Sequence, residues 1–154
     1  MPTIRLRMKR SPFSILLAAL AALTFTTSAK ADDLKAMEGK WTVEKTEAGG
    51  KSIESDDLKA LVVTIKGDRY TLLTKDGTDA GSLQLDETKK PKTMDATDTE
   101  GDDVGKVVKA IYEISGDTMR VCYALDDSGR PTEFATKEGS PFLLVTYKRE
   151  KPAK

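Results

Sequence analysis

The feature that most restricts the fold is a series of short, β-branched and apolar segments that follow one another with only tight turns between most of them. Asp76-Gly77 is the strongest short hairpin signal in the chain, and Gly116-Asp117 is a second pair of similar kind. Glycine and aspartate tolerate positive φ at low cost, so such pairs favour turns that return the chain antiparallel to itself. The pattern predicts an antiparallel meander of eight strands, at residues 41–44, 61–65, 70–73, 81–85, 94–97, 107–114, 119–124 and 142–149.

A sheet of eight strands with two free edges invites association with other chains, and closure into a barrel is the usual way to remove those edges. We therefore predict an all-β fold, an eight-stranded antiparallel up-and-down barrel. A short helical turn is expected before the first strand, with Asp33 as its cap and Gly39 after its end. Eight strands enclose an interior that side chains fill or that holds one small ligand, and the sequence is compatible with either.

The first 31 residues have the three parts of a secretory signal peptide. A basic start is followed by an apolar run over residues 13–25, and Ala29-Lys30-Ala31 fits the small-residue cleavage pattern. An uncleaved N-terminal anchor is the alternative interpretation, although the apolar run is short for a membrane span. We predict a signal peptide at residues 1–31, a barrel domain at 32–150 and a tail at 151–154, in a protein exported to the periplasm or outside the cell.

The charge and the rare residue types exclude several function classes. The leader holds five basic residues and no acidic one, so residues 32–154 contain 20 basic and 25 acidic residues, a formal charge of −5. Such a domain has no electrostatic footprint for nucleic acid or an anionic membrane surface. The sequence has no histidine, which removes Ser-His-Asp, Cys-His and His-zinc chemistry. Cys122, the only cysteine, is either a half-buried strand residue or a site of pairing between chains.

Alternating residues of the predicted strands place one set of apolar and tyrosine side chains on a single face of the sheet. This face is either the wall of a hydrophobic ligand cavity, with tyrosine hydroxyls as its few polar anchors, or an ordinary packed core. The candidate lumen residues are Val63, Ile65, Tyr70, Leu72, Leu83, Tyr112, Val121 and Tyr123.

An acidic stretch around residue 101 contains Asp98, Glu100, Asp102 and Asp103. Clustered carboxylates suit calcium, which takes six to eight oxygen ligands, but the spacing does not match an EF-hand loop. We therefore interpret these residues as solvated loop charge, and expect no metal site.

The longest irregular segment, residues 126–140, contains the distinctive run from Arg130 to Phe134. Arg130 and Glu133 are placed to bridge each other, and Phe134 to anchor the segment inward. The segment is either a recognition loop at the barrel mouth or a long loop pinned to the barrel. A short strand around residues 132–136 is expected within it.

The order of a short helix, Gly39-Lys40-Trp41, an eight-stranded meander and a basic residue on the last strand resembles the lipocalin or calycin superfamily. In that superfamily the tryptophan closes one end of the barrel beneath an arginine, a role that Arg149, or Lys148, is placed to fill. For Trp41, stacking on a ligand is the alternative. The chain is more specifically similar to a family of exported lipocalin-like domains, found chiefly in planctomycetes, which has no assigned function. The matching segments are residues 39–41, 67–70, 89–93, 111–113, 116–118 and 130–134.

The resemblance implies a barrel and export, and it implies no catalytic residue. We predict a monomeric exported protein without enzymatic activity or cofactor, with no nucleic-acid partner and no membrane contact after signal cleavage. The leading hypothesis is a carrier or sensor of a small hydrophobic molecule held in the barrel lumen. The alternative is a solid-cored interaction module that binds another extracytoplasmic protein through its loops, for example as a protease inhibitor. A lumen above ~300 Å³ favours the carrier.

Overall fold

The structure, a computed structural model, describes residues 32–153, so the predicted leader at residues 1–31 lies outside the described part. Within these residues no helix has the length and apolar character needed to cross a bilayer. The elements in chain order are α1 (Asp32–Met37), β1 (Gly39–Ala48), β2 (Lys51–Ile53), α2 (Asp56–Lys59), β3 (Val62–Lys66), β4 (Arg69–Leu73), β5 (Thr78–Asp86), β6 (Lys92–Glu100), β7 (Val107–Ser115), β8 (Thr118–Ala124) and β9 (Phe142–Arg149).

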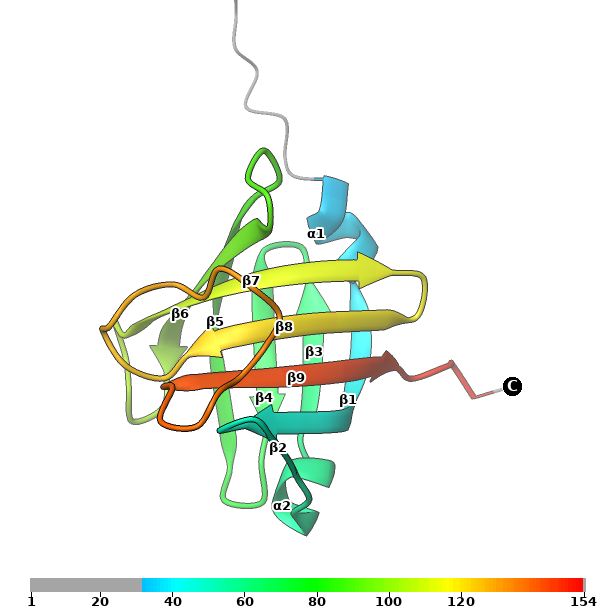
Figure 1. The fold of residues 1–154 in the computed structure, drawn as a ribbon. Coiled ribbons are helices and arrows are strands. Elements are labelled where there is room, and N and C mark those ends of the chain that lie inside the picture. The colour runs from blue at the N-terminus through cyan, green and yellow to red at the C-terminus, as the bar shows by residue number, and fades with distance from the viewer. Residues whose placement is uncertain (1–31, 154) are drawn as a thin grey trace, which may run out of the picture.

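The strands form a closed eight-stranded antiparallel barrel with one extra strand, as the hairpin pattern predicts (Figure 1). Each of β3 to β9 pairs with its neighbour in sequence, and β9 pairs back onto β1. Trp41 lies opposite Val63 of β3 on one side and opposite Arg149 of β9 on the other. The two short helices lie at opposite ends of the barrel (Figure 1).

Several local features differ from the sequence predictions, and β1 and β5 are both longer than predicted. Residues 51–53, where the sequence predicts no strand, form β2, which pairs with the last part of β1 where β3 is no longer alongside. β6 covers residues 92–100 and is longer than expected, because backbone pairing to β5 and β7 extends it through a polar sequence with weak alternation. Residues 132–136 form no strand within the described chain.

The loop of residues 125–141 lies across the outer face of β7, β8 and β9 (Figure 1). Arg130 holds it there: its Nη1 donates to the carbonyls of Met94 (2.8 Å) and Ala110 (2.7 Å), and its Nη2 pairs with Asp95 (2.5 Å). The predicted bridge from Arg130 to Glu133 is therefore wrong, because the carbonyls and carboxylate of the barrel wall bind the guanidinium instead.

The same loop covers a second, smaller apolar cluster on the outside of the barrel. Phe134 packs against this cluster, whose buried members are Ile111, Cys122 and Leu144. Cys122 is fully buried there, and burial raises the pKa of its thiol. The structure thus matches the interpretation of a loop pinned to the barrel, and it buries the cysteine more deeply than the half-exposed position expected from sequence.

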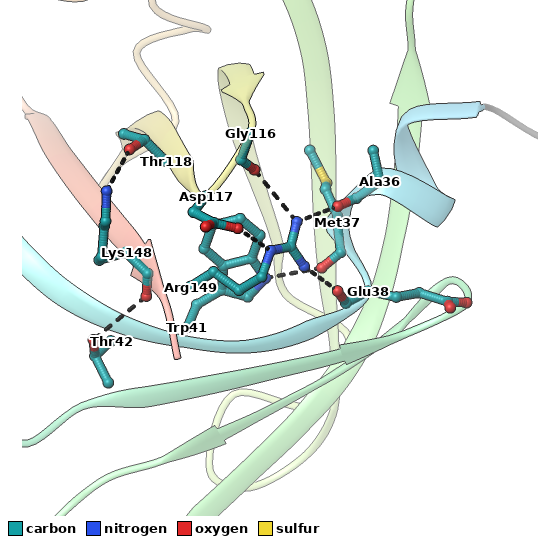
Figure 2. A network of polar contacts seen from close by, with 10 residues as sticks. All are labelled: Ala36, Met37, Glu38, Trp41, Thr42, Gly116, Asp117, Thr118, Lys148 and Arg149. Carbon is teal, nitrogen blue, oxygen red and sulfur yellow. Dashed lines mark hydrogen bonds and ion pairs between the residues drawn. The ribbon is translucent and has the colours of Figure 1, made fainter. Parts of the chain in front are cut away.

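The main core closes the α1 end of the barrel around Trp41, which has no exposed surface. The indole Nε1 donates a hydrogen bond of 2.8 Å to the carbonyl of Met37, the last residue of α1. The Arg149 guanidinium lies over the indole ring, with its central carbon 4.2 Å from the ring centroid (Figure 2). A cation over an indole face contributes roughly 0.5–2 kcal/mol, more as the pair is desolvated.

The Arg149 guanidinium also satisfies backbone carbonyls that the end of α1 leaves free. It donates to the carbonyls of Ala36 (2.6 Å) and Glu38, and its Nε lies 3.2 Å from Asp117 in the β7–β8 turn (Figure 2). Gly39 makes this approach possible: its φ is +132°, and a Cβ there would lie 2.9 Å from Nη1 of Arg149. A side chain at residue 39 would therefore strain the backbone and crowd the guanidinium.

We predict that Trp41→Ala unfolds the domain or lowers its free energy of unfolding by about 3–5 kcal/mol, as large-to-alanine changes of buried aromatics do. Such a loss is a large share of the ~5–15 kcal/mol that stabilises an ordinary domain. Urea denaturation followed by circular dichroism measures the effect. Val104→Ala, at a residue that is 64% exposed, is the control and should leave the midpoint unchanged. A Trp41→Ala protein as stable as wild type would contradict the structural role.

Candidate ligand-binding cavity

A cavity of about 440 Å³ lies inside the barrel. It extends from the end covered by α2, where Leu58 and Leu61 line it, inward to Ile65 and Met119. All eight barrel strands contribute to its wall, and the lining is mainly apolar. Seven of the eight residues predicted from sequence lie in this wall: Val63, Ile65, Tyr70, Leu72, Leu83, Val121 and Tyr123.

The eighth predicted lumen residue, Tyr112, does not line the cavity. It is 1% exposed and belongs to the core that closes the α1 end. Its hydroxyl donates a 2.9 Å hydrogen bond to Asp33 of α1, which also pairs with Lys92 at 2.6 Å. Alternation predicts the correct face of the sheet for Tyr112, but it contains no information on the depth of that residue along the barrel axis.

Tyr70 and Asp98 face each other across an intervening strand. Tyr70 of β4 lies opposite Gly81 of β5, and Gly81 lies opposite Asp98 of β6. A Cβ on Gly81 would lie 2.4 Å from the Tyr70 ring and 2.3 Å from the carbonyl oxygen of Thr97, so only glycine leaves room for the ring to cross β5. The Tyr70 hydroxyl then reaches Asp98 and donates a hydrogen bond to its Oδ1.

A second polar pair lies between β8 and β9. The hydroxyls of Tyr123 and Tyr147 are 3.0 Å apart, and both residues line the cavity. Burial raises the pKa of Tyr123 well above its ordinary value and that of Tyr147 to about 12. Burial, followed by the hydrogen bond to Asp98, likewise raises the pKa of Tyr70. These phenols therefore stay neutral and available as hydrogen-bonding groups inside an apolar wall.

Thr46 of β1 also lines the cavity, and it is 2% exposed. It lies opposite Val145, another lining residue, so the two side chains share the inner face. Within residues 32–153, its Oγ1 is the one buried side-chain oxygen or nitrogen without a hydrogen-bond partner. A buried hydroxyl left unpaired costs about 1–3 kcal/mol of stability.

Acidic residues from neighbouring strands line one side of the cavity at its solvent-exposed end. The lining includes the carboxylates of Asp98 and Glu100 on β6 and of Asp102 and Asp103 in the following turn. Asp79 of β5 joins them, with its Oδ1 so close to Gly101 that a Cβ there would lie 2.3 Å away. The described residues contain no group of three or more acidic, cysteine or histidine side chains arranged to hold a metal ion. The sequence interpretation of plain loop charge misses the position of these groups at the cavity mouth.

Sequence reasoning also missed several wall residues, for two different reasons. Val145 and Tyr147 follow the same alternation as the candidates and were open to prediction from the last strand. Thr46 was not, because the register shifts between Val43 and Lys45. An extra residue on one strand reverses which side chains face inward, so Thr46 rather than Lys45 lies on the inner face.

The fold and the cavity define a class: closed antiparallel barrels of eight strands with room in the lumen for one small molecule. No protein-family model matches this chain, and a search of curated proteins finds no match either. Similarity to exported lipocalin-like domains therefore stays a prediction, with which the closed barrel is compatible.

We predict that Thr46→Val raises the free energy of unfolding by about 1 kcal/mol, because it removes an unpaired buried hydroxyl while nearly keeping the side-chain shape. The urea midpoint at constant m-value measures the change. Thr42→Val is the matched control on the same strand: its Oγ1 donates to the Lys148 carbonyl at 3.4 Å, so no gain is expected. A loss of stability in Thr46→Val would show that the hydroxyl contributes to the folded state.

We also predict that stability falls steeply above pH ~10, the ordinary pKa of tyrosine. All four tyrosines of the sequence have raised pKa values, Tyr147 to about 12, with burial as the main cause. Between the two values the unfolded chain has lost phenolic protons that the folded chain keeps, so ionisation favours unfolding. Below pH ~10 the tyrosines leave stability unchanged.

The measurement is the urea midpoint as a function of pH, with tyrosinate absorbance recorded on the same samples. Absorbance should rise with unfolding rather than before it. Tyr147→Phe should flatten the alkaline decline relative to wild type. Tyrosinate formation near pH ~10 in the folded protein would contradict the burial argument.

Proposed function

We propose that the protein binds a small apolar molecule in the barrel lumen and acts as an exported, non-catalytic carrier or sensor. The single observation that supports this proposal most is the cavity of about 440 Å³ with its mainly apolar lining. Its volume falls within the roughly 300–1,000 Å³ of known small-molecule sites, which are apolar with a few placed polar groups. Export rests on the leader sequence of residues 1–31.

The unpaired Thr46 hydroxyl is a second support. A protein selected only for a packed interior has no use for a buried hydroxyl that lacks a partner, and valine would fit there at lower cost. Strained residues that persist in folded proteins cluster at functional sites, and an unsatisfied buried polar group likewise calls for an explanation such as a bound molecule. We therefore attribute Thr46 to the ligand rather than to the fold.

The interaction-module alternative receives less support. That hypothesis asks for a filled interior and a projecting loop. The interior holds a cavity, and the longest loop is held against the barrel wall through Arg130 and Phe134. For this reason we favour the carrier.

Native mass spectrometry of the protein purified from its own exported compartment tests the proposal. We expect a reproducible additional mass of a few hundred daltons on the mature chain. Small ligands gain ~0.3–1.5 kcal/mol of binding free energy per non-hydrogen atom, so tens of such atoms or fewer are enough for stable binding. A bare mature mass that stays bare after exposure to a lipid extract would overturn the carrier hypothesis.

Two matched variants link any added mass to the lumen. Ala96→Phe fills the cavity from its wall, and it should abolish the additional mass while the protein stays folded. Val107→Phe introduces the same ring at a residue of β7 that is 46% exposed and outside the cavity lining, and it should retain the ligand. Equal loss or equal retention in both variants would place the ligand elsewhere.

A further inference from the structure

We propose that the ligand is a cationic amphiphile, an apolar body with an ammonium-type head group at the acidic mouth of the lumen. This inference rests on the proposed function and adds the chemical class of the ligand. It comes from the unequal distribution of charge along the cavity. The inner part is apolar and tyrosine-lined, whereas five carboxylates line the cavity against one basic residue among the described side chains: Asp79, Asp98, Glu100, Asp102 and Asp103 against Lys106.

The one basic lining residue does not neutralise the five carboxylates, which together form the acidic rim of the cavity mouth. Lys106 Nζ lies 3.6 Å from Asp103, a pair whose side chains are 53% and 66% exposed. Exposed pairs of that kind interact weakly in water. Arg69 on the neighbouring β4 donates to Thr99 and is not part of the lining. The remaining carboxylates favour a cation at the mouth and disfavour a fatty-acid carboxylate.

Asp98 is the carboxylate best placed to meet a head group at the level of the tyrosines. It is half-buried, and Tyr70 donates to Oδ1 only. An ionised carboxylate accepts at both oxygens, so Oδ2 keeps its capacity to accept from an ammonium N–H. The hydrogen bond from Tyr70, held in place by Gly81, fixes the direction of the carboxylate before any ligand arrives.

Thr46 is an independent indication that a polar ligand atom enters the cavity. Thr46 is 2% exposed, its hydroxyl has no partner among residues 32–153, and the residue lies on the inner face of β1 in the cavity wall. A wholly apolar ligand would leave that hydroxyl unpaired in the bound state as well. An amine bearing N–H donors, or a hydroxyl on the ligand body, would pair it.

Calorimetric titration with three probes of one chain length separates the claims: decylammonium, 1-decanol and decanoate, all below their aggregation concentrations at pH 7. Alkylammonium groups are cationic at this pH, as the lysine pKa of ~10.4 indicates. We expect decylammonium to bind at least about tenfold more tightly than decanol, and decanoate to bind more weakly than decanol. Rim carboxylates are solvent-screened, so the preference should shrink as ionic strength rises.

A charge-removal variant tests the rim directly. Glu100→Gln/Asp102→Asn/Asp103→Asn should bring decylammonium close to decanol without changing the affinity for decanol. The control, Glu44→Gln/Asp127→Asn/Glu138→Gln, removes the same charge at three exposed residues outside the lining and should keep most of the preference. Asp98→Asn should lower decylammonium affinity further while the amide oxygen still accepts from Tyr70.

The outcomes are distinct. Saturable binding of decanol with no preference for decylammonium would contradict the proposed cationic head group and would remain consistent with the proposed carrier function. Tighter binding of decanoate would do the same. No saturable binding of any probe would overturn both proposals. If both triple variants reduced the preference for decylammonium equally, the preference would come from the net charge of the protein, and the proposed role of the rim would be wrong.

Discussion

The stack of Arg149 on Trp41 is the interaction on which the rest of the barrel depends. These residues belong to the last and first strands, and they lie opposite each other in the register that closes the sheet. The same guanidinium binds the carbonyls at the end of α1 and the aspartate of the β7–β8 turn (Figure 2). Carbonyls at a helix end lack partners within the helix, and the Arg149 guanidinium donates hydrogen bonds to them. One cation therefore contacts α1, β1 and the β7–β8 turn at the place where they meet.

Local chemistry explains how much of this fold the sequence predicts. Tight turns such as Asp76-Gly77 and the alternation within each strand are properties of a few neighbouring residues, and eight strands with antiparallel neighbours follow from them. Depth in the barrel and irregularities of register are not local. Tyr112 and Tyr70 have similar patterns around them, yet one is buried against α1 and the other lines the lumen.

In the candidate site, too, some residues follow from local sequence patterns and others depend on the three-dimensional arrangement of the sheet. Seven of its wall residues were identified from alternation, whereas Thr46 was hidden by a shift of register on β1. The acidic residues were visible in the sequence as a cluster, but their meaning depends on what lies beneath them. Asp79 comes from a different strand and reaches the same rim only because β5 and β6 pair. Such groupings need the sheet in three dimensions.

The barrel has an enclosed interior only because β1 pairs with β9. Thr42 and Lys148 are in contact across 106 residues of sequence, whereas the other strand pairs of the barrel join segments that are close along the chain. Hairpins can form early, but bringing the two ends of the meander together carries the entropy of closing nearly the whole domain into a loop. The closed end around Trp41 and the lumen therefore exist only where β9 is paired with β1, and a chain that lacked β9 would form an open sheet without an enclosed cavity.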